Sequence, residues 1–330
     1  MTLSTRFTAR FGVRHPIALA PMAMVADWEL ARAVGDAGGL GILGAGYATQ
    51  PWLDDQLEKG PIDGLGVGFI TWALAEHPEC LEKVVERRPA AIMLSFGDAG
   101  TFAPAIRNAG IPLICQIQTI EQAGQAIDIG ADVIVAQGGE AGGHGAAHRS
   151  SFTLIPEMAD RLDRYAPDTL LLAAGGVADG RSLAAALALG ADGAIVGTRF
   201  WAAVESPIPS AAKKHALAAS GDDTVRQRAL DIVRQLEWPA PYTIRTLRNS
   251  FTERWHGYED ELRADVDVQR ARFLNARQDE DYDFADVVVG EAIGQINQVQ
   301  PVAAIIDEMV TTASRILNRR AAELETDKGQ

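Results

Sequence analysis

Short hydrophobic runs recur along roughly the first 200 residues of the chain, and longer amphipathic segments separate them. Glycine or proline bounds most of these runs. Short apolar runs bounded in this way are typical of parallel strands that are buried on both faces. The predicted strands cover residues 16–20, 39–43, 64–70, 90–96, 112–117, 132–136, 170–174 and 193–197.

The segments between these runs have the spacing of amphipathic helices. They cover residues 28–37, 51–59, 78–88, 101–109, 120–129, 155–165 and 180–189. Four helix-to-strand junctions share one signal, a glycine just after the last helical turn, in AVGDAGGLGI, AIRNAGIPLI, AIDIGADVIV and ALALGADGAI. Glycine is favoured there because it adopts a left-handed backbone at little cost. We therefore predict an α/β fold of the (β/α)8 TIM-barrel type. A doubly wound sheet would instead predict GxGxxG after the first strand, where this chain reads APMAMVADW.

The pattern changes after residue 200. Residues 201–283 are rich in charged residues and helix formers, and they predict a small helical addition that covers the substrate. Residues 285–296 (ADVVVGEAIGQI) return to a strand-like pattern, and residues 303–318 predict a closing helix before a solvated tail. The predicted domains are a barrel formed by residues 1–200 and 284–330 and an addition formed by residues 201–283.

Composition narrows the class of protein. A formal net charge of −14 argues against nucleic acid and anionic membranes as partners. No apolar stretch approaches the length of about 18 residues needed to cross a membrane, and the N-terminal residues lack the pattern of a signal peptide. With only two cysteines and no HExxH motif, we predict no metal site. The resulting expectation is a cytoplasmic protein.

The loops after the seventh and eighth strands are candidates for binding phosphate. Barrel active sites lie at the C-terminal ends of the strands, and these two loops often hold a phosphate group. Here they contain Gly175, Gly176, Gly197 and Thr198. Glycine N–H groups and the Thr198 hydroxyl can donate hydrogen bonds to an anion.

The most unusual stretch follows the sixth strand and reads AQGGEAGGHGAAHRS, residues 136–150. Glycine loses the most backbone freedom on folding, so a loop this rich in glycine brings its backbone close to something or bends through positive φ. His144 has an unperturbed pKa suited to proton transfer and is the predicted catalytic residue. His148 is a weaker candidate, and Glu140 is expected either to brace the loop through backbone N–H groups or to take part in the chemistry.

These motifs resemble the nitronate monooxygenases, a family of FMN-dependent barrels. The resemblance covers PIALAPMA (16–23), AVGDAGGLGILGAG (33–46), AQGGEAGGHGA (136–146), residues 173–200 and LRNSF (247–251). Position by position, it implies that Ala20 and Met22 pack against the flavin and that Gln116 reaches the polar edge of its ring. It further implies that Ala136, Gly138 and Gly142 line the cofactor site and that Gly175, Gly176, Gly197 and Thr198 hold the phosphate. His144 would then face the substrate.

One position departs from the family. The family often has Gly-Val-Asn-Phe after the third strand, with the asparagine bonded to the flavin, whereas this chain has Gly68 at that place. Thr71 or water would fill the space, or the pocket differs. Specificity is also expected to depend on the addition, which contains Arg245, Arg248, Asn249 and Trp255.

The resemblance implies oxidation of alkyl nitronates, such as propionate 3-nitronate, by O₂ to a carbonyl compound and nitrite. One alternative is an NAD(P)H-dependent flavin reductase that acts on quinones or enoyl thioesters. Another is a flavin-free barrel that binds a phosphorylated metabolite. The predicted partners are a small-molecule substrate and O₂, and a homodimer is a possible assembly.

Overall fold

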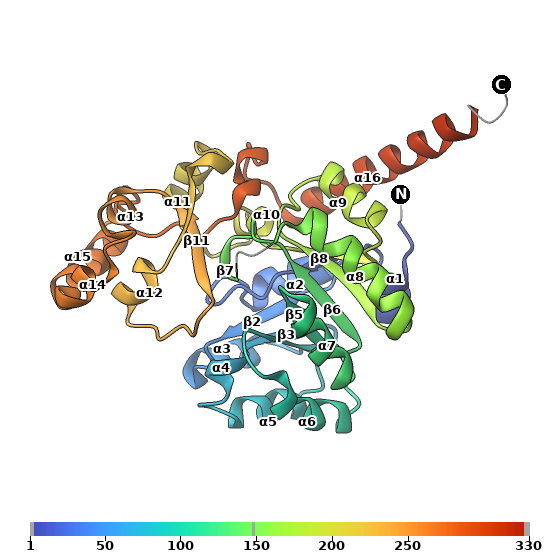
Figure 1. The fold of residues 1–330 in the computed structure, drawn as a ribbon, viewed down its shortest axis with the longest axis horizontal. Coiled ribbons are helices and arrows are strands. Elements are labelled where there is room, and N and C mark those ends of the chain that lie inside the picture. The colour runs from blue at the N-terminus through green and yellow to red at the C-terminus, as the bar shows by residue number, and fades with distance from the viewer. Residues whose placement is uncertain (1–2, 147–148, 327–330) are drawn as a thin grey trace.

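Eight parallel strands form a closed barrel in the computed structural model, which describes residues 3–146 and 149–326 (Figure 1). The strands are β1 (Ile17–Leu19), β2 (Ile42–Gly46), β3 (Gly66–Ile70), β4 (Ala91–Ser95), β5 (Leu113–Ile117), β6 (Val133–Gln137), β8 (Leu170–Ala174) and β9 (Gly193–Val196). β1 pairs with β9, and on its other side Leu19 and Ile17 exchange backbone hydrogen bonds of 2.9 Å with Leu40, just before β2. The predicted (β/α)8 fold is confirmed.

Helices cover the outside of the barrel. They are α2 (Trp28–Asp36), α3 (Gln50–Lys59), α5 (Glu79–Glu86), α6 (Ala103–Asn108), α7 (Ile120–Asp128), α8 (Ser151–Tyr165) and α9 (Gly180–Ala188). The glycines after four of them have φ of +92° (Gly38), +71° (Gly110), +77° (Gly130) and +99° (Gly190). The repeated glycine signal therefore marks left-handed helix ends, as predicted.

Side chains alternate between the barrel interior and the layer beneath the helices. In β6, Val133 and Val135 belong to the interior cluster, whereas Ile134 and Ala136 belong to the outer one. The short helix α1 (Arg6–Phe11) contributes Phe7 to the interior cluster. This alternation decides which residues at the strand ends can reach the mouth of the barrel.

The addition is inserted between the last strand and the last helix of the barrel. The chain leaves the barrel after α10 (Thr198–Trp201) and returns as α16 (Val302–Thr326), which packs against α9 and α2. The contact with α9 is close, because a Cβ atom at Gly180 would lie 2.5 Å from the carbonyl oxygen of Met309. Figure 1 shows the addition, in yellow and orange, to one side of the barrel.

The addition is not purely helical, contrary to the sequence-based expectation. Its helices are α11 (Ser210–Leu217), α12 (Ala229–Arg234), α13 (Ser250–Trp255), α14 (Glu259–Ala264) and α15 (Val266–Gln278). It also contains β10 (Thr224–Gln227) and β11 (Thr243–Leu247), which pair antiparallel. In β11, Ile244 and Thr246 are buried while Thr243 and Arg245 are half-buried, which is the period-two pattern of a strand.

The predicted strand at residues 285–296 is wrong. This segment runs extended and then forms a 3₁₀ helix, η3 (Glu291–Gln295). Within the described residues, one backbone hydrogen bond, from Leu247 N–H to Val287 O, joins it to β11. Val287 and Val289 are instead buried in a cluster with Trp201 and Leu247, so the apolar pattern reflects burial without strand pairing.

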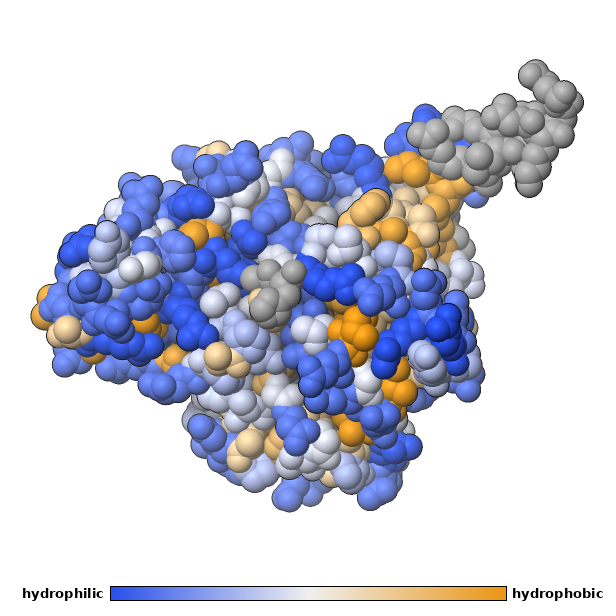
Figure 2. Space-filling view, in the orientation of Figure 1, coloured by the Kyte–Doolittle hydropathy of each residue, from blue (hydrophilic) through white to orange (hydrophobic). Residues whose placement is uncertain are grey.

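The face of the molecule drawn in Figure 2 is mostly hydrophilic, in keeping with the net charge of −14. Hydrophobic residues gather where α16 leaves the body. Among residues 3–146 and 149–326, no helix combines the length and the hydropathy that crossing a bilayer requires.

Candidate active site

The glycine-rich loop after β6 is built into the sheet of the addition. Its residues Gly143–Gly145 form β7, which pairs antiparallel with β11, so that β10, β11 and β7 make a three-stranded sheet. His144 lies opposite Ile244 in this pairing. Figure 1 shows β7 beside β11 at the junction of barrel and addition. The addition therefore fixes the backbone of the predicted catalytic histidine.

The His144 side chain is held at one edge and on one face. Its Nε2 lies 2.9 Å and 3.1 Å from the two carboxylate oxygens of Asp231 on α12. Both side chains are deeply buried, at 9% and 5% exposure. The indole of Trp238 stacks on the imidazole with ring centroids 3.4 Å apart and an interplanar angle of 9°.

The surroundings of His144 are aromatic. Edge-on contacts with centroid distances of 5.2–6.2 Å join Trp238 to four further rings, those of Tyr47, Trp72, Phe96 and Tyr242. The indole N–H of Trp238 also donates a hydrogen bond to the Tyr47 hydroxyl. These rings come from separate loops of the barrel and from the addition, and the sequence analysis did not connect them.

Burial lowers the pKa of His144 below its usual value of 6.5, although the hydrogen bond to Asp231 opposes this effect. Arg234 and Arg226 act in the same direction as burial, because their charges disfavour a second cation. The imidazole is therefore neutral at neutral pH. A carboxylate can only accept a hydrogen bond, so Nε2 carries the single ring proton and Nδ1 carries the lone pair. Nδ1 has no partner among the residues that the structure describes.

Arg226 on β10 braces the loop that carries His144. Its guanidinium donates hydrogen bonds of 2.7–3.3 Å to the carbonyl oxygens of Gly139, Ala141, Gly143, Gly145 and Thr243. Burial lowers the pKa of Arg226 to about 10, so the side chain remains charged at neutral pH. A single cation thus satisfies carbonyls along most of the glycine-rich loop.

Three glutamines form a network at the mouth of the barrel. The amide oxygen of Gln137 accepts hydrogen bonds from Gln116 (3.2 Å) and Gln118 (2.7 Å). Its amide nitrogen donates to the backbone carbonyl of His144 at 3.0 Å. Of these three glutamines, only Gln116 was predicted from the sequence as a site residue. Strand alternation could have identified Gln137, since it follows the inward-facing Val135 by two residues and Val133 by four.

The predicted phosphate loops lie beside the first βα loop. A Cβ atom at Gly197 would lie 3.5 Å from Ala20 Cβ and 3.8 Å from Met22 Sδ, so these three predicted cofactor residues are neighbours. Gly175 and Gly176 have φ of +98° and +71°. Gly138 joins this group, because its N–H bonds the carbonyl of Ala174 and its carbonyl lies against Gly175.

Three other predicted cofactor residues have contacts that limit their role. A Cβ atom at Gly142 would lie 2.5 Å from Gly290 N, so the missing side chain makes room for the addition. Thr198 Oγ1 accepts a hydrogen bond of 2.9 Å from Gly290 N–H, which leaves its own proton free to donate. The side chain of Ala136 faces the helix layer, so only its backbone can face the barrel mouth.

A cavity of about 590 Å³ adjoins Gly176 and is also lined by Arg245, Glu140 and Glu291. The Arg245 guanidinium is paired with Glu291 at 2.9 Å, and its buried Nε has no hydrogen-bond partner among the described residues. The glycine loops and the Thr198 hydroxyl supply donors that can bind a phosphate group. The cavity itself is lined by the carboxylates of Glu140, Asp222 and Glu291 as well as by Arg245.

Other candidate residues have structural roles. Glu140 accepts a hydrogen bond from Ser151 N–H at 3.1 Å and another from its hydroxyl, so it braces the start of α8. Asn249 caps α13 and donates to Ala285 O, and Trp255 is buried in the core of the addition. Arg245 and Arg248 were the two candidate arginines of the addition. Arg245 lines the cavity beside Gly176, and Arg248 does not. His148 lies outside the described residues.

The departure at Gly68 has a steric cause. A Cβ atom there would lie 2.4 Å from Pro21 Cβ, so proline occupies the space that an asparagine side chain would need. Neither Thr71 nor water needs to fill that space. Thr71 nevertheless has a buried hydroxyl with no partner among the described residues, at the end of β3. This hydroxyl is a donor that a ligand at the mouth can use.

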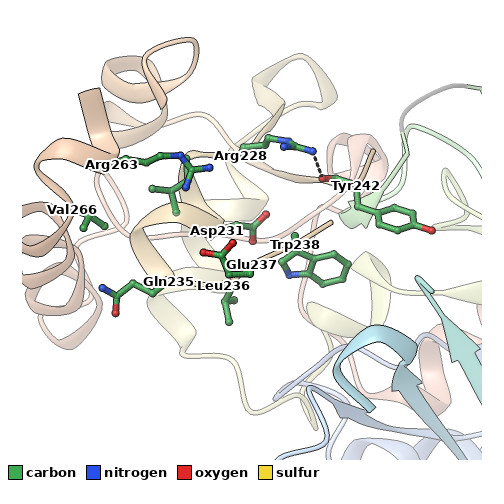
Figure 3. Close-up of a pocket in the computed structure, with 10 residues that line it drawn as sticks. Arg228, Asp231, Gln235, Leu236, Glu237, Trp238, Tyr242, Arg263 and Val266 are labelled. Carbon is green, nitrogen blue, oxygen red and sulfur yellow. Dashed lines mark hydrogen bonds between the residues drawn. The ribbon is translucent and has the colours of Figure 1, made fainter. Parts of the chain in front are cut away.

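A second pocket, of about 390 Å³, lies in the addition (Figure 3). In this view Arg228 and Arg263 lie above Asp231 and Glu237, which are next to each other, and Trp238 lies beside them. Asp231 and Trp238 are the two residues that hold His144, so this pocket adjoins the support of the histidine rather than the histidine itself. In the described part of the chain, no group of three or more His, Cys, Asp or Glu side chains could hold a metal ion.

Glycine-rich loops and a buried histidine at one mouth of the barrel are the architecture of TIM-barrel enzymes that bind a phosphate-bearing ligand. A model of the nitronate monooxygenase family matches residues 4–60 and 73–312. The chain belongs to this family and is a flavin-dependent oxidoreductase. The unmatched residues between the two ranges include Gly68, the position that departs from the family pattern.

Individual relatives agree with this assignment. The chain is 31% identical to a nitronate monooxygenase of Neurospora crassa, over 90% of this chain and 88% of that protein. It is 33% identical to the nitronate monooxygenase npaC of Metarhizium robertsii, over 92% of each. The structure of FabK from Thermotoga maritima superposes with a TM-score of 0.84 at 27% identity, over 98% of this chain and all of that one. The flavin-free alternative is therefore set aside.

Proposed function

We propose that this protein uses FMN to oxidise alkyl nitronates, such as propionate 3-nitronate, with O₂ to a carbonyl compound and nitrite. The observation that carries the proposal is the placement of His144. It lies in the glycine-rich loop at the barrel mouth, neutral, buried and held by Asp231. Family membership supports flavin-dependent oxidation as the reaction class. The site supports a substrate that exchanges a proton with the single imidazole of His144 or is oriented beside it.

The proposed FMN site follows the glycine loops. Gly175, Gly176, Gly197 and Thr198 would hold the phosphate, with the charge of Arg245 nearby. The ring would be contacted by Ala20, Met22 and Gln116 and by the backbone at Ala136, Gly138 and Gly142. When bound, the flavin supplies the redox chemistry. The buried and unpartnered Thr71 hydroxyl would be a further donor to the flavin. Loss of the asparagine at position 68 would itself be tolerated, since one hydrogen bond is worth about 1 kcal/mol net.

The lowered pKa of His144 favours the neutral imidazole, which can accept a proton from a neutral nitroalkane at Nδ1. A nitronate supplied as the anion needs no such proton transfer. The neutral imidazole has no free N–H to donate to this anion, so the aromatic surroundings would orient the nitronate and exclude water. The same enzyme would thus use both forms, but it would depend on the base only for the nitroalkane.

An anaerobic absorbance titration of the purified protein tests the reaction. Propionate 3-nitronate is added to one sample and NADH to another. We expect the flavin band to change with the nitronate and to ignore NADH. Bleaching by NADH with no response to the nitronate would instead assign the protein as a flavin reductase. A preparation without a flavin band that also fails to bind added FMN would overturn the cofactor assignment.

Substitution of the histidine tests its role. His144→Asn should retain FMN but lower kcat for a neutral nitroalkane by about 10²–10⁴-fold, the usual contribution of a general base. His256→Asn is the control, because this histidine is exposed on the addition. Unchanged turnover in His144→Asn would remove His144 from the mechanism.

A further inference from the structure

We infer that Asp231 is a positioning residue: its carboxylate fixes the proton of His144 on Nε2 and thereby leaves Nδ1 as the atom that accepts a proton from substrate. This inference rests on the proposed function for its catalytic part. It also assigns a catalytic contribution to the addition, which the sequence indicated only as a cover for the substrate.

The geometry is specific to this pair. Both oxygens of Asp231 lie within hydrogen-bond distance of Nε2, at 2.9 Å and 3.1 Å, and both side chains are almost fully buried. A buried carboxylate requires a partner, and His144 Nε2 is the side-chain partner that the described structure gives to Asp231. Asp231 thus needs His144 as the partner of its buried charge, and His144 needs Asp231 to hold its ring proton.

Two further contacts prevent the imidazole from escaping this arrangement. The flat stack of Trp238 against the ring blocks rotation of the imidazole out of its plane. The pairing of β7 with β11 and the bond from Gln137 to the His144 carbonyl fix the backbone. Because Nε2 is hydrogen-bonded and the ring cannot turn, Nδ1 is the ring nitrogen of His144 that can accept a proton.

Several charges besides Asp231 face the imidazole. On α12, Arg234 follows Asp231 by one turn, and Arg226 approaches from β10, and both lower the pKa of His144. Tyr242, next to Trp238, is uncharged at neutral pH because burial raises its pKa. Removing the Asp231 charge leaves only groups that disfavour a protonated imidazole, so the pKa of His144 must fall further.

The variant Asp231→Asn tests the inference. Its amide can donate to Nε2 as well as accept from it, so the ring proton is no longer fixed on one nitrogen. We expect kcat for a neutral nitroalkane to fall by about 10- to 100-fold, part of the contribution of a general base. Turnover of the preformed nitronate should fall less, and the acid limb of the pH profile should move to lower pH. Asp231→Glu, which restores a carboxylate, should recover part of the loss.

Glu237→Gln is the matched control. This exposed carboxylate lines the same pocket as Asp231 and makes no hydrogen bond to His144 in the described structure. This variant should leave unchanged both the ratio of nitroalkane turnover to nitronate turnover and the acid limb of the pH profile. A loss in Asp231→Asn that is equal for nitroalkane and nitronate, with an unmoved acid limb, would overturn the inference in favour of a purely structural role.

A readout independent of turnover separates this inference from the proposed function. In ¹⁵N-histidine-labelled protein, the His144 signals are assigned by their loss in His144→Asn. We expect a neutral ring protonated on Nε2 in the parent protein, and a mixed or reversed tautomer in Asp231→Asn. Tautomer spectra as expected, with no nitronate turnover, would refute the proposed function alone. An unchanged tautomer in Asp231→Asn would refute the positioning role of Asp231.

Discussion

At the scale of single residues, the site depends on close backbone approaches as much as on side-chain chemistry. Gly68 lies against Pro21, and Gly142 lies against Gly290. The sequence could identify such glycines as special but not say what they touch, because the contacting residues are far apart along the chain. Gly142 was predicted to line the cofactor site, and the structure shows that its missing side chain makes room for Gly290.

Restoring the family residue at position 68 should therefore fail to improve the protein. Gly68→Asn places a side chain within 2.4 Å of Pro21 Cβ, and overpacking of this kind costs about 1–3 kcal/mol. The free energy of unfolding, measured in urea, should fall by that amount. Gly64→Asn is the control, since a Cβ atom there has no neighbour within 4 Å. A Gly68→Asn variant as stable as the parent with tighter FMN binding would contradict the steric argument.

At the scale of elements, the barrel could be predicted and the addition could not. Each of the eight barrel strands has a local signal, an apolar run with a glycine or proline beside it. β7, β10 and β11 carry no comparable signal, because they consist mostly of polar residues or glycine and gain stability from partners distant in sequence. Asp231 and Trp238 were missed for the same reason: Asp231 is 87 residues from His144, and no local pattern joins them.

The dependence of β7 on Arg226 gives a prediction at this scale. Arg226→Met leaves buried carbonyls of the glycine-rich loop without their donor, which should cost at least about 1–3 kcal/mol of stability. Because the same loop carries His144, turnover should fall even in the fraction that remains folded and holds FMN. Urea unfolding and activity per bound flavin measure the two effects.

Arg263→Met serves as the comparison for that variant. Arg263 is an exposed arginine on α14, and surface substitutions usually change stability by less than about 0.5 kcal/mol. If Arg226→Met were equally neutral, the brace would have no energetic role.

At the scale of the whole molecule, barrel and addition form one structure that shares a sheet. The sequence predicted an addition near residues 201–283, and the structure shows an insertion between α10 and α16. Its covering role and the boundaries of a separate substrate domain stay predictions, as does a homodimer. The shared strand β7 means that any movement of the addition also moves the backbone of His144.

Overall stability should depend on pH through a buried thiol. Burial raises the pKa of Cys115 to about 12 from the usual value of 9.0. The folded state therefore keeps a proton that the unfolded state loses, and stability is lost as pH rises from 9 toward 12. The midpoint of thermal unfolding should decline less steeply over this range in Cys115→Ala than in the parent. Parallel declines would show that Cys115 ionises freely in the folded protein.

The position of α16 has a consequence for synthesis of the chain. α16 completes the helical layer between α9 and α2, yet about 100 residues of the addition precede it on the chain. At about 5–20 residues per second, the ribosome needs roughly 5–20 s to make that stretch. Throughout this interval all eight strands have been translated while the apolar side of α9 stays uncovered. The helical layer of the nascent barrel can therefore close only after the final helix has been made.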